Sequence, residues 1–469
     1  MAERRSRAES RSSKAPANTR HKKSASGTEP RIVRPSQNNV RVSRTSFEPA
    51  RPSTEAPRVS RAPEPVIEHW PIVTGGVDPW LTALIWGLVA FGVVMVYSAS
   101  GISASQSAHA NGQFYLIKQG IFACVGLPLM HLVSRLDYHW LKSISYLMLL
   151  GVVLLLSFVA LGFGHTAGGA ARWIPLGPIH MQPVEIAKVV WVCGLAYSLS
   201  RKGARIRSFS IGFFPHLLGA GLLALLCLRQ PDFGSAVMIV LITFFMLFAA
   251  GARLGYMLGA LLCAAPVAYL LVKHEPYRMA RLQAFLEPYE HRQGAGYQLW
   301  EAQLGFGSGG LHGLGLGYSR QKLMFLPEAH TDFIGAIVGE EFGLVGFVLL
   351  AAAFGFFIYR GLRAAFRAVD EHGTYLATGL TLLVGTQALT NLAVTVGLLP
   401  TKGLVLPFVS YGGSSLLMNC VALGVLLNVS KPRKPASDAA ASGARNSLAP
   451  QEAPRPSREK LPKFAGGVS

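Results

Sequence analysis

Ten apolar runs, each long enough or nearly long enough to cross a bilayer, constrain this chain more than any other feature of its sequence. They cover residues 80–99, 116–134, 144–163, 184–200, 211–228, 234–251, 255–272, 333–358, 374–398 and 405–428. A hydrocarbon core about 30 Å thick needs about 20 apolar residues in a helix. A helix also satisfies its own backbone hydrogen bonds inside lipid. We therefore predict an all-α integral membrane protein with ten transmembrane helices.

The amount and the placement of charge agree with this class of protein. Only 14% of the 469 residues are charged, against about 25% in soluble proteins. The net charge of +20 would suggest nucleic acid as the partner of a soluble protein. Here the basic residues lie in the two tails and in short connections between the apolar runs, as in cytoplasmic segments beside anionic lipid. The pattern thus argues against a nucleic-acid partner.

The chain divides into three parts by composition. Residues 1–78 are rich in Ser, Arg, Pro and Ala without apolar periodicity, which predicts a disordered basic tail. No apolar segment follows the opening Arg cluster as it does in a signal peptide. Residues 79–430 form the transmembrane domain, and residues 431–469 form a second disordered tail. The five cysteines all lie in apolar runs without a CxxC pair, so we predict neither disulfides, nor a metal site, nor a cofactor; a need for divalent cations stays open.

The basic connections set the predicted orientation. Segments 134–143, 200–208, 251–253, 359–367 and 430–434 are basic and alternate with the other connections, so we place them and both termini in the cytoplasm. The outer segments are then 100–115, 164–183, 229–233, 273–332 and 399–404. The long loop 273–332, between the seventh and eighth helices, is dense in motifs and cationic. Loops of this length are usually functional or disordered, and the motifs favour function with an anionic ligand.

The segment Gly168 to Lys188 brings three ionisable candidates to the outer side. Glu185 and Lys188 are three residues apart and share a helix face. They form either a self-neutralising ion pair or part of a polar cavity, since ionisable groups at membrane depth usually face one. Arg172, followed by Trp173, is either an interfacial anchor or a contact to phosphate and sugar.

Three further motifs border the outer side. In RQPDFG, Asp232 is placed to cap the sixth helix. In PTKGLVLPFVSYGGSS, Lys402 lies at the outer turn, and Pro407 is expected to break the tenth helix and free backbone groups. Ser410 and the two serines after it either bind a polar ligand or cap the broken helix. The glycines of 305–317 do not follow a nucleotide-binding spacing, which favours close backbone packing.

The long outer loop holds the remaining candidates. Its first part, YRMARLQAFLEPYEHRQGAGYQ, contains Arg278, Arg281 and Glu287. Its last part, SRQKLMFLPEAHTDF, contains His330 and Asp332, and His330 is either a general base or a hydrogen-bonded structural residue. A carboxylate among cations at an outer membrane surface suits sugar transfer from a lipid pyrophosphate. That reaction needs a base for the acceptor hydroxyl and cations for the departing pyrophosphate.

The motifs together resemble a known family. RWIPLG, QPVEIAK, RQPDFGSA, GYQLWEAQLGFGSGG, LPEAHTDFIGAIVGEEFG and GLLPTKGLVLPFVSYGGSS are similar to those of the SEDS (FtsW/RodA/SpoVE) proteins over about residues 78–430. Within the family they resemble the cell-division type more than the elongation type. The resemblance implies a ten-helix peptidoglycan glycosyltransferase of the bacterial inner membrane at the division septum. It would polymerise lipid II with a class B penicillin-binding transpeptidase and other division proteins as partners.

The resemblance also implies roles for individual residues. The family's catalytic Asp lies in an FLDP motif, and this chain reads FLEP, which puts Glu287 at that position. Glu287 would be the catalytic base, although its extra methylene moves the carboxylate by about 1 Å, a displacement that can cost about 10²-fold in rate. The substrate would be bound by the other outer candidates, which are Arg278, Arg281, Glu185, Lys188, Arg172, Lys402, His330, Asp332 and Ser410. Two other functions stay open: a lipid II flippase or transporter, and a non-catalytic division scaffold that recruits a transpeptidase.

Overall fold

The computed structural model describes residues 72–106, 111–167, 170–177 and 179–434. Most of both predicted disordered tails, residues 1–71 and 435–469, lies outside the described residues. The described part is mainly helical. Its α-helices are α1 Pro79–Gln106, α2 Phe114–Arg135, α3 Trp140–Phe158, α4 Pro183–Lys202, α5 Phe214–Arg229, α6 Phe233–Ala249, α7 Leu254–Lys273, α8 Pro276–Leu286, α9 Tyr297–Gly309, α10 Ile334–Phe366, α11 Glu371–Thr395 and α12 Gly413–Val429.

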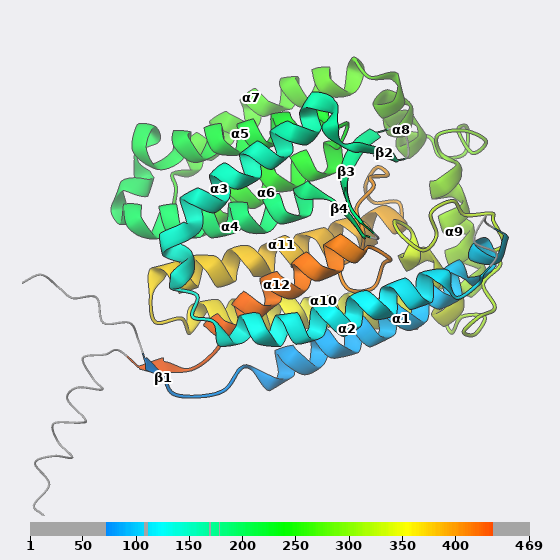
Figure 1. Ribbon diagram of the computed structural model, residues 1–469. Coiled ribbons are helices and arrows are strands. Elements are labelled where there is room, and N and C mark those ends of the chain that lie inside the picture. Colours follow the sequence, from blue (N-terminus) through cyan, green and yellow to red (C-terminus); the bar gives the residue numbers. More distant parts are fainter. Residues whose placement is uncertain (1–71, 107–110, 168–169, 178, 435–469) are drawn as a thin grey trace, which may run out of the picture. The chain divides into compact units, whose positions relative to one another are not determined.

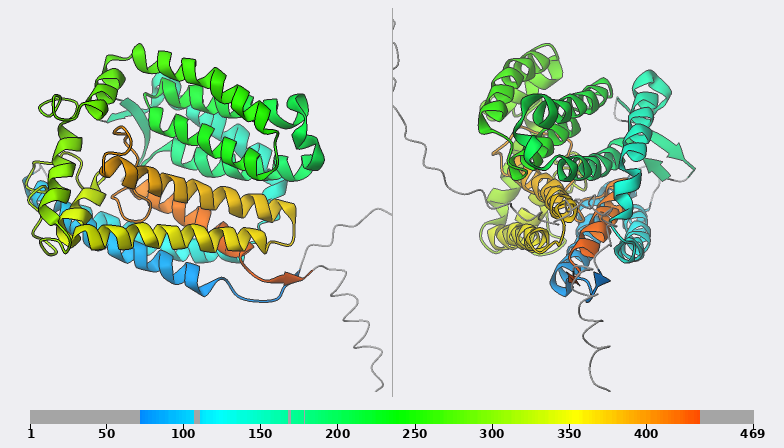
Figure 2. Two further views of the ribbon diagram at one scale, coloured as in Figure 1. Left: turned by 180° about the vertical axis from the view of Figure 1, so that it is seen from behind. Right: turned by 90° about the vertical axis from the view of Figure 1, so that its left-hand side faces the viewer.

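The long helices run roughly side by side and form a bundle (Figures 1 and 2). Helices α4 and α11 lie at its centre, where α11 packs against α4, α6, α10 and α12. Helix α7 is at the edge and has no buried residue. We call the end of the bundle that carries α8 and α9 the loop end. The opposite end, where Ile72 and Lys434 lie, is the tail end.

Most of the predicted membrane spans appear as helices that fit a bilayer. Among the described residues, eight helices are long and apolar enough to cross a membrane. The predicted sixth and tenth spans correspond to two shorter apolar helices, α6 and α12. The turn that contains Asp232 separates α5 from α6. After Pro407 the chain stays non-helical until α12 begins at Gly413. The helical membrane class is thus confirmed, and the count of ten spans stays a prediction.

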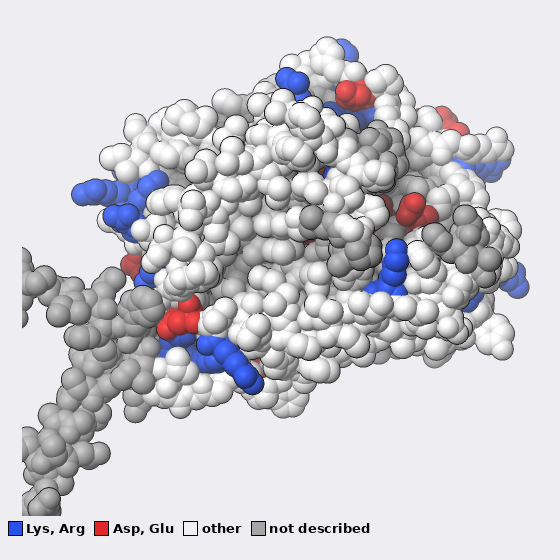
Figure 3. Space-filling model, viewed as in Figure 1, with Lys and Arg blue, Asp and Glu red and all other residues white. Residues whose placement is uncertain are grey.

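The surface has the polarity that a membrane protein needs. Figure 3 shows a broad uncharged belt across the middle of the helices, with charged side chains concentrated towards the two ends. Large apolar side chains of α3 and α7 are exposed, for example Leu147, Leu154 and Leu262. In water such exposure would be costly, whereas in lipid it is the favoured state of these side chains.

Two small antiparallel sheets depart from the purely helical prediction. β1 (Ile72–Val73) pairs with β5 (Arg433–Lys434) at the tail end, which brings the first and last described residues together. At the loop end, β3 (Ala170–Leu176) lies between β2 (His165–Ala167) and β4 (Ile179–Met181). These strands have two to seven residues. Their pairing depends on tertiary context, so the helical periodicity of the chain does not reveal them.

The glycine-rich segment confirms the prediction of close backbone packing. A Cβ on Gly309 would lie 2.2 Å from the carbonyl oxygen of Gly339, and one on Gly313 would lie 2.2 Å from that of Glu341. The backbone N–H of Leu314 donates to the Glu340 carbonyl at 3.0 Å. Helix α10 is interrupted at Gly343, whose φ of 68° lies in the left-handed region that favours glycine. The segment after α9 therefore fits into a kink in α10.

Candidate functional site

Polar side chains of α11 hold together the segments that meet at the loop end. The Gln387 amide donates to the Val405 carbonyl at 3.1 Å. One turn later, the Asn391 amide donates to the carbonyls of Leu404 at 2.6 Å and Asp332 at 2.8 Å. These bonds satisfy backbone groups in a stretch that Pro407 keeps out of helical structure. They fix the segment 396–412 against the residues that precede α10.

Three cations lie around the beginning of α6. Arg278 in α8 lies 5.4 Å and Lys402 lies 6.0 Å from the centre of the Phe233 ring. Arg172 in β3 donates to the backbone oxygens of Gln230 (3.0 Å) and Pro231, just before this helix. Burial lowers the pKa of the Lys402 ammonium. Desolvated cations of this kind bind anions more strongly than solvated ones.

Arg281 joins α8 to the same region. Its guanidinium donates to the Thr401 carbonyl at 3.3 Å and lies 4.5 Å from the centre of the Tyr277 ring. The structure thus brings together four of the predicted substrate-binding cations from three separate parts of the chain. These are Arg172, Arg278, Arg281 and Lys402.

Asp232 has the capping role that its sequence position predicts. Its carboxylate accepts hydrogen bonds from the Ser235 backbone N–H at 3.0 Å and the Ser235 hydroxyl at 2.8 Å. It therefore satisfies a backbone donor at the start of α6 that would otherwise lack a partner.

Asp332 is a carboxylate close to two of these cations, Arg281 and Arg172. Its carboxylate Oδ2 lies 3.4 Å from where a Cβ on Gly403 would stand. Burial raises the pKa of Asp332 to about 7; the charges of Glu328 and Asp232 add to the rise, while those of Arg281 and Arg172 oppose it. An acid of this kind changes its protonation near neutral pH, which is a property of many functional groups.

Glu185 and Lys188 form an ion pair, which is one of the two roles that their spacing left open. The Lys188 ammonium lies 2.9 Å from the Glu185 carboxylate and donates to the Gln387 amide oxygen at 3.2 Å. Only 7% of Glu185 and 3% of Lys188 is exposed. The pair is buried between α4 and α11, and it reaches the loop-end site through Gln387.

Glu287 follows directly on α8, the helix that carries Arg278 and Arg281. It ends α8, is exposed, and its backbone N–H donates to the Gln283 carbonyl at 2.9 Å. The His291 Nδ1 atom lies 3.2 Å from the Glu287 carbonyl oxygen. Among the described residues, no hydrogen bond or ion pair involves the Glu287 carboxylate. Glu287 and His291 therefore share one exposed turn after α8.

His330 and Ser410 make contacts that fit structural roles. The His330 ring lies 4.6 Å from that of Tyr115 and 5.9 Å from that of Tyr411, measured between ring centres. Burial lowers the pKa of His330, and the Glu328 charge opposes this. The Ser410 hydroxyl accepts a hydrogen bond from the Leu406 backbone N–H at 2.9 Å, which stabilises the turn before α12.

Several residues of this region could not be assigned from the sequence. Gln387, Asn391, Phe233 and Tyr115 lie in apolar runs or beside them, and they resemble ordinary helix residues. The one sequence feature that could have pointed to contacts between segments is the polar pair Gln387 and Asn391, which are four residues apart within a predicted membrane helix. Amides in such helices usually bond across to a neighbouring segment.

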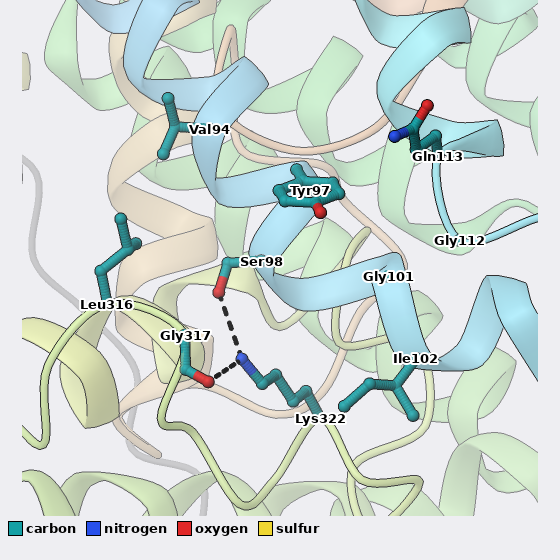
Figure 4. Close-up of a pocket in the computed structure, with 10 residues that line it drawn as sticks. All are labelled: Val94, Tyr97, Ser98, Gly101, Ile102, Gly112, Gln113, Leu316, Gly317 and Lys322. Carbon is teal, nitrogen blue, oxygen red and sulfur yellow. Dashed lines mark hydrogen bonds between the residues drawn. The ribbon is translucent and has the colours of Figure 1, made fainter.

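A cavity of about 470 Å³ lies elsewhere, between α1, the two residues just before α2 and residues 316–322 (Figure 4). Lys322 is in its wall and donates to the Gly317 carbonyl (2.5 Å), Glu341 (3.2 Å) and Ser98 (3.5 Å). All three ammonium protons thus have partners. The pair of Lys322 and Glu341 ties the outer loop to α1 and α10.

The fold and the site together define a class: a helical membrane protein whose bundle carries, at one end, several cations and a half-buried carboxylic acid. A family model described as that of a cell cycle protein, covering FtsW, RodA and SpoVE, matches residues 79–435. The chain belongs to this family.

Relatives and solved structures agree with this assignment. A probable peptidoglycan glycosyltransferase FtsW of Geobacter metallireducens is 45% identical over 348 residues, covering 74% of this chain and 92% of the relative. One of Coxiella burnetii is 43% identical over 356 residues, covering 75% and 95%. A solved structure described under "Structural coordination of polymerization and crosslinking by a peptidoglycan synthase complex" has a TM-score of 0.63 at 29% identity, covering 76% and 97%. The rod shape determining protein RodA of Thermus thermophilus has a TM-score of 0.57 at 28% identity, covering 76% and 96%.

Proposed function

We propose that this chain is a peptidoglycan glycosyltransferase that polymerises lipid II into glycan strands during septal cell-wall synthesis. The observation that carries the proposal is the set of cations near Asp332 at the loop end: the charges of Arg172 and Arg281 act on its carboxyl group, and Lys402 is next to Gly403, which lies against that group. The names of the FtsW relatives support the same activity. A lipid-linked sugar pyrophosphate is anionic, and its polyprenyl chain stays in the bilayer, so a site at the end of a membrane bundle fits both parts.

The reaction joins an acceptor sugar hydroxyl to C1 of the donor sugar. The hydroxyl oxygen forms the new bond to C1, the bond from C1 to the pyrophosphate oxygen breaks, and that oxygen keeps the electron pair. The hydroxyl proton passes to a base. The cations of the site stabilise the negative charge that grows on the pyrophosphate. Glu185 and Lys188 support the site from below through Gln387.

We assign the base to Glu287, whose carboxylate is exposed and has no described partner. Its place at the end of α8 puts it on the same helix as Arg278 and Arg281. A carboxylate that is not engaged within the protein is available to an incoming acceptor hydroxyl. His291, in the same turn, is the other group that could take a proton there, because a neutral imidazole is an effective base.

The test is lipid II polymerisation by the purified full chain together with its transpeptidase partner. We expect Glu287→Gln to lower the rate by about 10²-fold or more, because loss of a general base costs roughly 10²–10⁴-fold. Glu287→Asp is expected to retain measurable activity, since it keeps the carboxylate. Glu290→Gln, an exposed carboxylate three residues away, is the matched control and should polymerise like the wild type.

Each result points to a definite assignment. A Glu287→Gln variant as active as the wild type would remove Glu287 from the base role. If His291→Asn is then inactive, the base is His291. A wild-type chain that moves lipid II across reconstituted vesicles without forming polymer would favour the flippase function instead.

We also propose the setting in which this enzyme works. In this proposal both termini are in the cytoplasm and the loop end is on the outer face of the bacterial inner membrane at the division septum; the basic connections and tails support this orientation. The similarity to a structure that couples polymerization and crosslinking supports a class B penicillin-binding transpeptidase as partner. Lipid II, the growing glycan strand and other division proteins complete the expected partners.

A further inference from the structure

We propose that Asp332 is a second catalytic group, which donates a proton to the pyrophosphate oxygen as that oxygen leaves C1 of the donor sugar. The inference rests on the proposed function and assigns the acid that complements its base. Asp332 lies in the connection between α9 and α10, and α11 fixes its backbone through the 2.8 Å bond from Asn391 to its carbonyl oxygen.

Charged residues of four segments act on the Asp332 carboxyl group. Glu328 belongs to its own connection, Arg281 to α8, Arg172 to β3 and Asp232 to the turn between α5 and α6. Gly403, next to Lys402, lies against its carboxylate. Among the described residues, no donor bonds this carboxylate, whereas the carboxylates of Asp232 and of Glu340 in α10 each accept two or more hydrogen bonds.

The charge of the substrate explains why an acid is needed here. A pyrophosphate held by Arg172, Arg281 and Lys402 would be repelled by an ionised carboxylate in their midst. A protonated Asp332 instead offers a hydrogen-bond donor to a phosphate oxygen. The pKa of about 7 leaves a large fraction protonated at neutral pH, and a bound anion raises that fraction further, since a nearby negative charge disfavours ionisation.

The proton balance of the step is complete. The acceptor hydroxyl loses its proton to Glu287 as its oxygen bonds to C1. The bond from C1 to the pyrophosphate oxygen breaks, and the oxygen takes the electron pair together with the proton of Asp332. Asp332 is left ionised beside a negatively charged product, which favours release of the polyprenyl pyrophosphate, and water then returns its proton. Two carboxyl groups with distinct surroundings thus serve as base and acid, as in inverting sugar hydrolysis.

The pH dependence of lipid II polymerisation by the full chain with its transpeptidase partner tests this role. For the wild type we expect kcat/KM to fall at alkaline pH, with an apparent pKa of about 7, because the acid form is then lost. Asp332→Asn keeps the shape and a donor but cannot transfer a proton. It should lower kcat by about 10²-fold or more, leave KM for lipid II nearly unchanged and abolish the alkaline decline.

Two further variants complete the design. Asp332→Glu keeps a titratable acid and should restore an alkaline decline at a shifted position. Glu301→Gln removes a carboxylate of α9 outside the site and should leave both rate and profile unchanged.

The unfolding temperature separates a catalytic defect from misfolding. Ionised Asp332 is disfavoured in the folded state, since burial raises its pKa, so the native form loses stability as pH rises from about 4 to 7. Asp332→Asn avoids this cost and should unfold no lower than the wild type at pH above 7. The role of Asp332 would be overturned if Asp332→Asn polymerised lipid II at the wild-type rate or kept the alkaline decline in kcat/KM. It would also be overturned if Asp332→Glu showed no alkaline decline. A wild-type chain without polymerase activity would instead overturn the proposed function.

Discussion

At the residue scale, four carboxylates near the loop end have the same chemistry and four different environments. Glu185 is neutralised by Lys188 at 2.9 Å, Asp232 bonds the start of α6, and Asp332 lies among cations without a described donor. Glu287 is exposed at the end of α8. Residue type alone therefore does not say which carboxylate caps, pairs or reacts. The donors placed around each one decide its role.

The cap formed by Asp232 gives a stability prediction at this scale. Asp232→Ala should lower the free energy of unfolding by about 1 kcal/mol, because the Ser235 N–H loses its acceptor. Asp232→Asn keeps an acceptor oxygen and should cost only a few tenths of that amount. The measurement is the thermal unfolding midpoint of the purified protein in one detergent. Equal losses in the two variants would show that the charge, and not the cap, is what stabilises α6.

At the scale of elements, α9 and α10 approach each other closely enough to exclude side chains. Gly309 faces the Gly339 carbonyl, and the segment after Gly309 donates backbone hydrogen bonds to Glu340 and Glu341 of α10. The Glu340 carboxylate, fully buried, in turn accepts the backbone N–H of Arg320 at 2.9 Å. The outer loop is thereby held on the helix that follows Asp332.

Two glycines of α9 provide a matched test of this packing. Gly309→Ala would place a methyl group 2.2 Å from a backbone oxygen and should destabilise the protein by about 1–3 kcal/mol. Gly307→Ala has nothing within 4 Å of its Cβ and lies inside the same helix, so it should be neutral or stabilise by up to about 1 kcal/mol. Thermal unfolding of both variants decides the matter. A Gly309→Ala protein as stable as Gly307→Ala would contradict the close approach.

At the scale of the whole molecule, charged side chains at the tail end join connections far apart in the sequence. Asp370, between α10 and α11, binds the Tyr138 hydroxyl and lies 3.1 Å from Lys142. Asp137, between α2 and α3, lies 3.2 Å from Arg433, which follows α12. Burial acts to raise the pKa of Asp370, but hydrogen bonds from His139 and Tyr138 outweigh it and hold the pKa well below its ordinary value. Burial also acts to raise the pKa of Asp137, but hydrogen bonds from His139 and the charge of Arg433 outweigh it, so that this pKa is lowered as well.

These lowered pKa values fix the sign of a pH effect. Ionised Asp370 and Asp137 stabilise the native state at neutral pH, and that contribution is lost as pH falls below about 4 towards their folded pKa values. Asp370→Asn should cost about 1–2 kcal/mol at neutral pH and little at acid pH. Glu371→Gln, at an exposed neighbouring site, should change stability by less than about 0.5 kcal/mol. Unfolding midpoints across this pH range test the prediction, and an Asn variant whose deficit persists at pH 3 would contradict it.

The sequence by itself determined the features that depend on local patterns. Runs of apolar residues set the helical membrane class, since lipid leaves a single chain segment few other ways to satisfy its backbone. The cap at Asp232, the break at Pro407, the pair of Glu185 with Lys188 and the tight packing of the 305–317 glycines followed from spacing and residue type. The small sheet at the loop end and the kink at Gly343 did not, because they exist only where distant segments meet.

The assembly of the site was decided by the tertiary structure. Arg172, Arg281, Lys402 and Asp332 are up to about 230 residues apart in the chain, and only the tertiary structure brings them to one region. Arg172 bonds the turn before α6, Arg281 bonds Thr401, and Asn391 of α11 bonds the backbone of Leu404 and Asp332. Sequence patterns named these residues as equal candidates. The folded structure distinguishes them: desolvation raises the pKa of Asp332, whereas Glu287 stays exposed to solvent. Desolvation and neighbouring charges depend on which groups are close in space, and the order of residues in the chain does not give this.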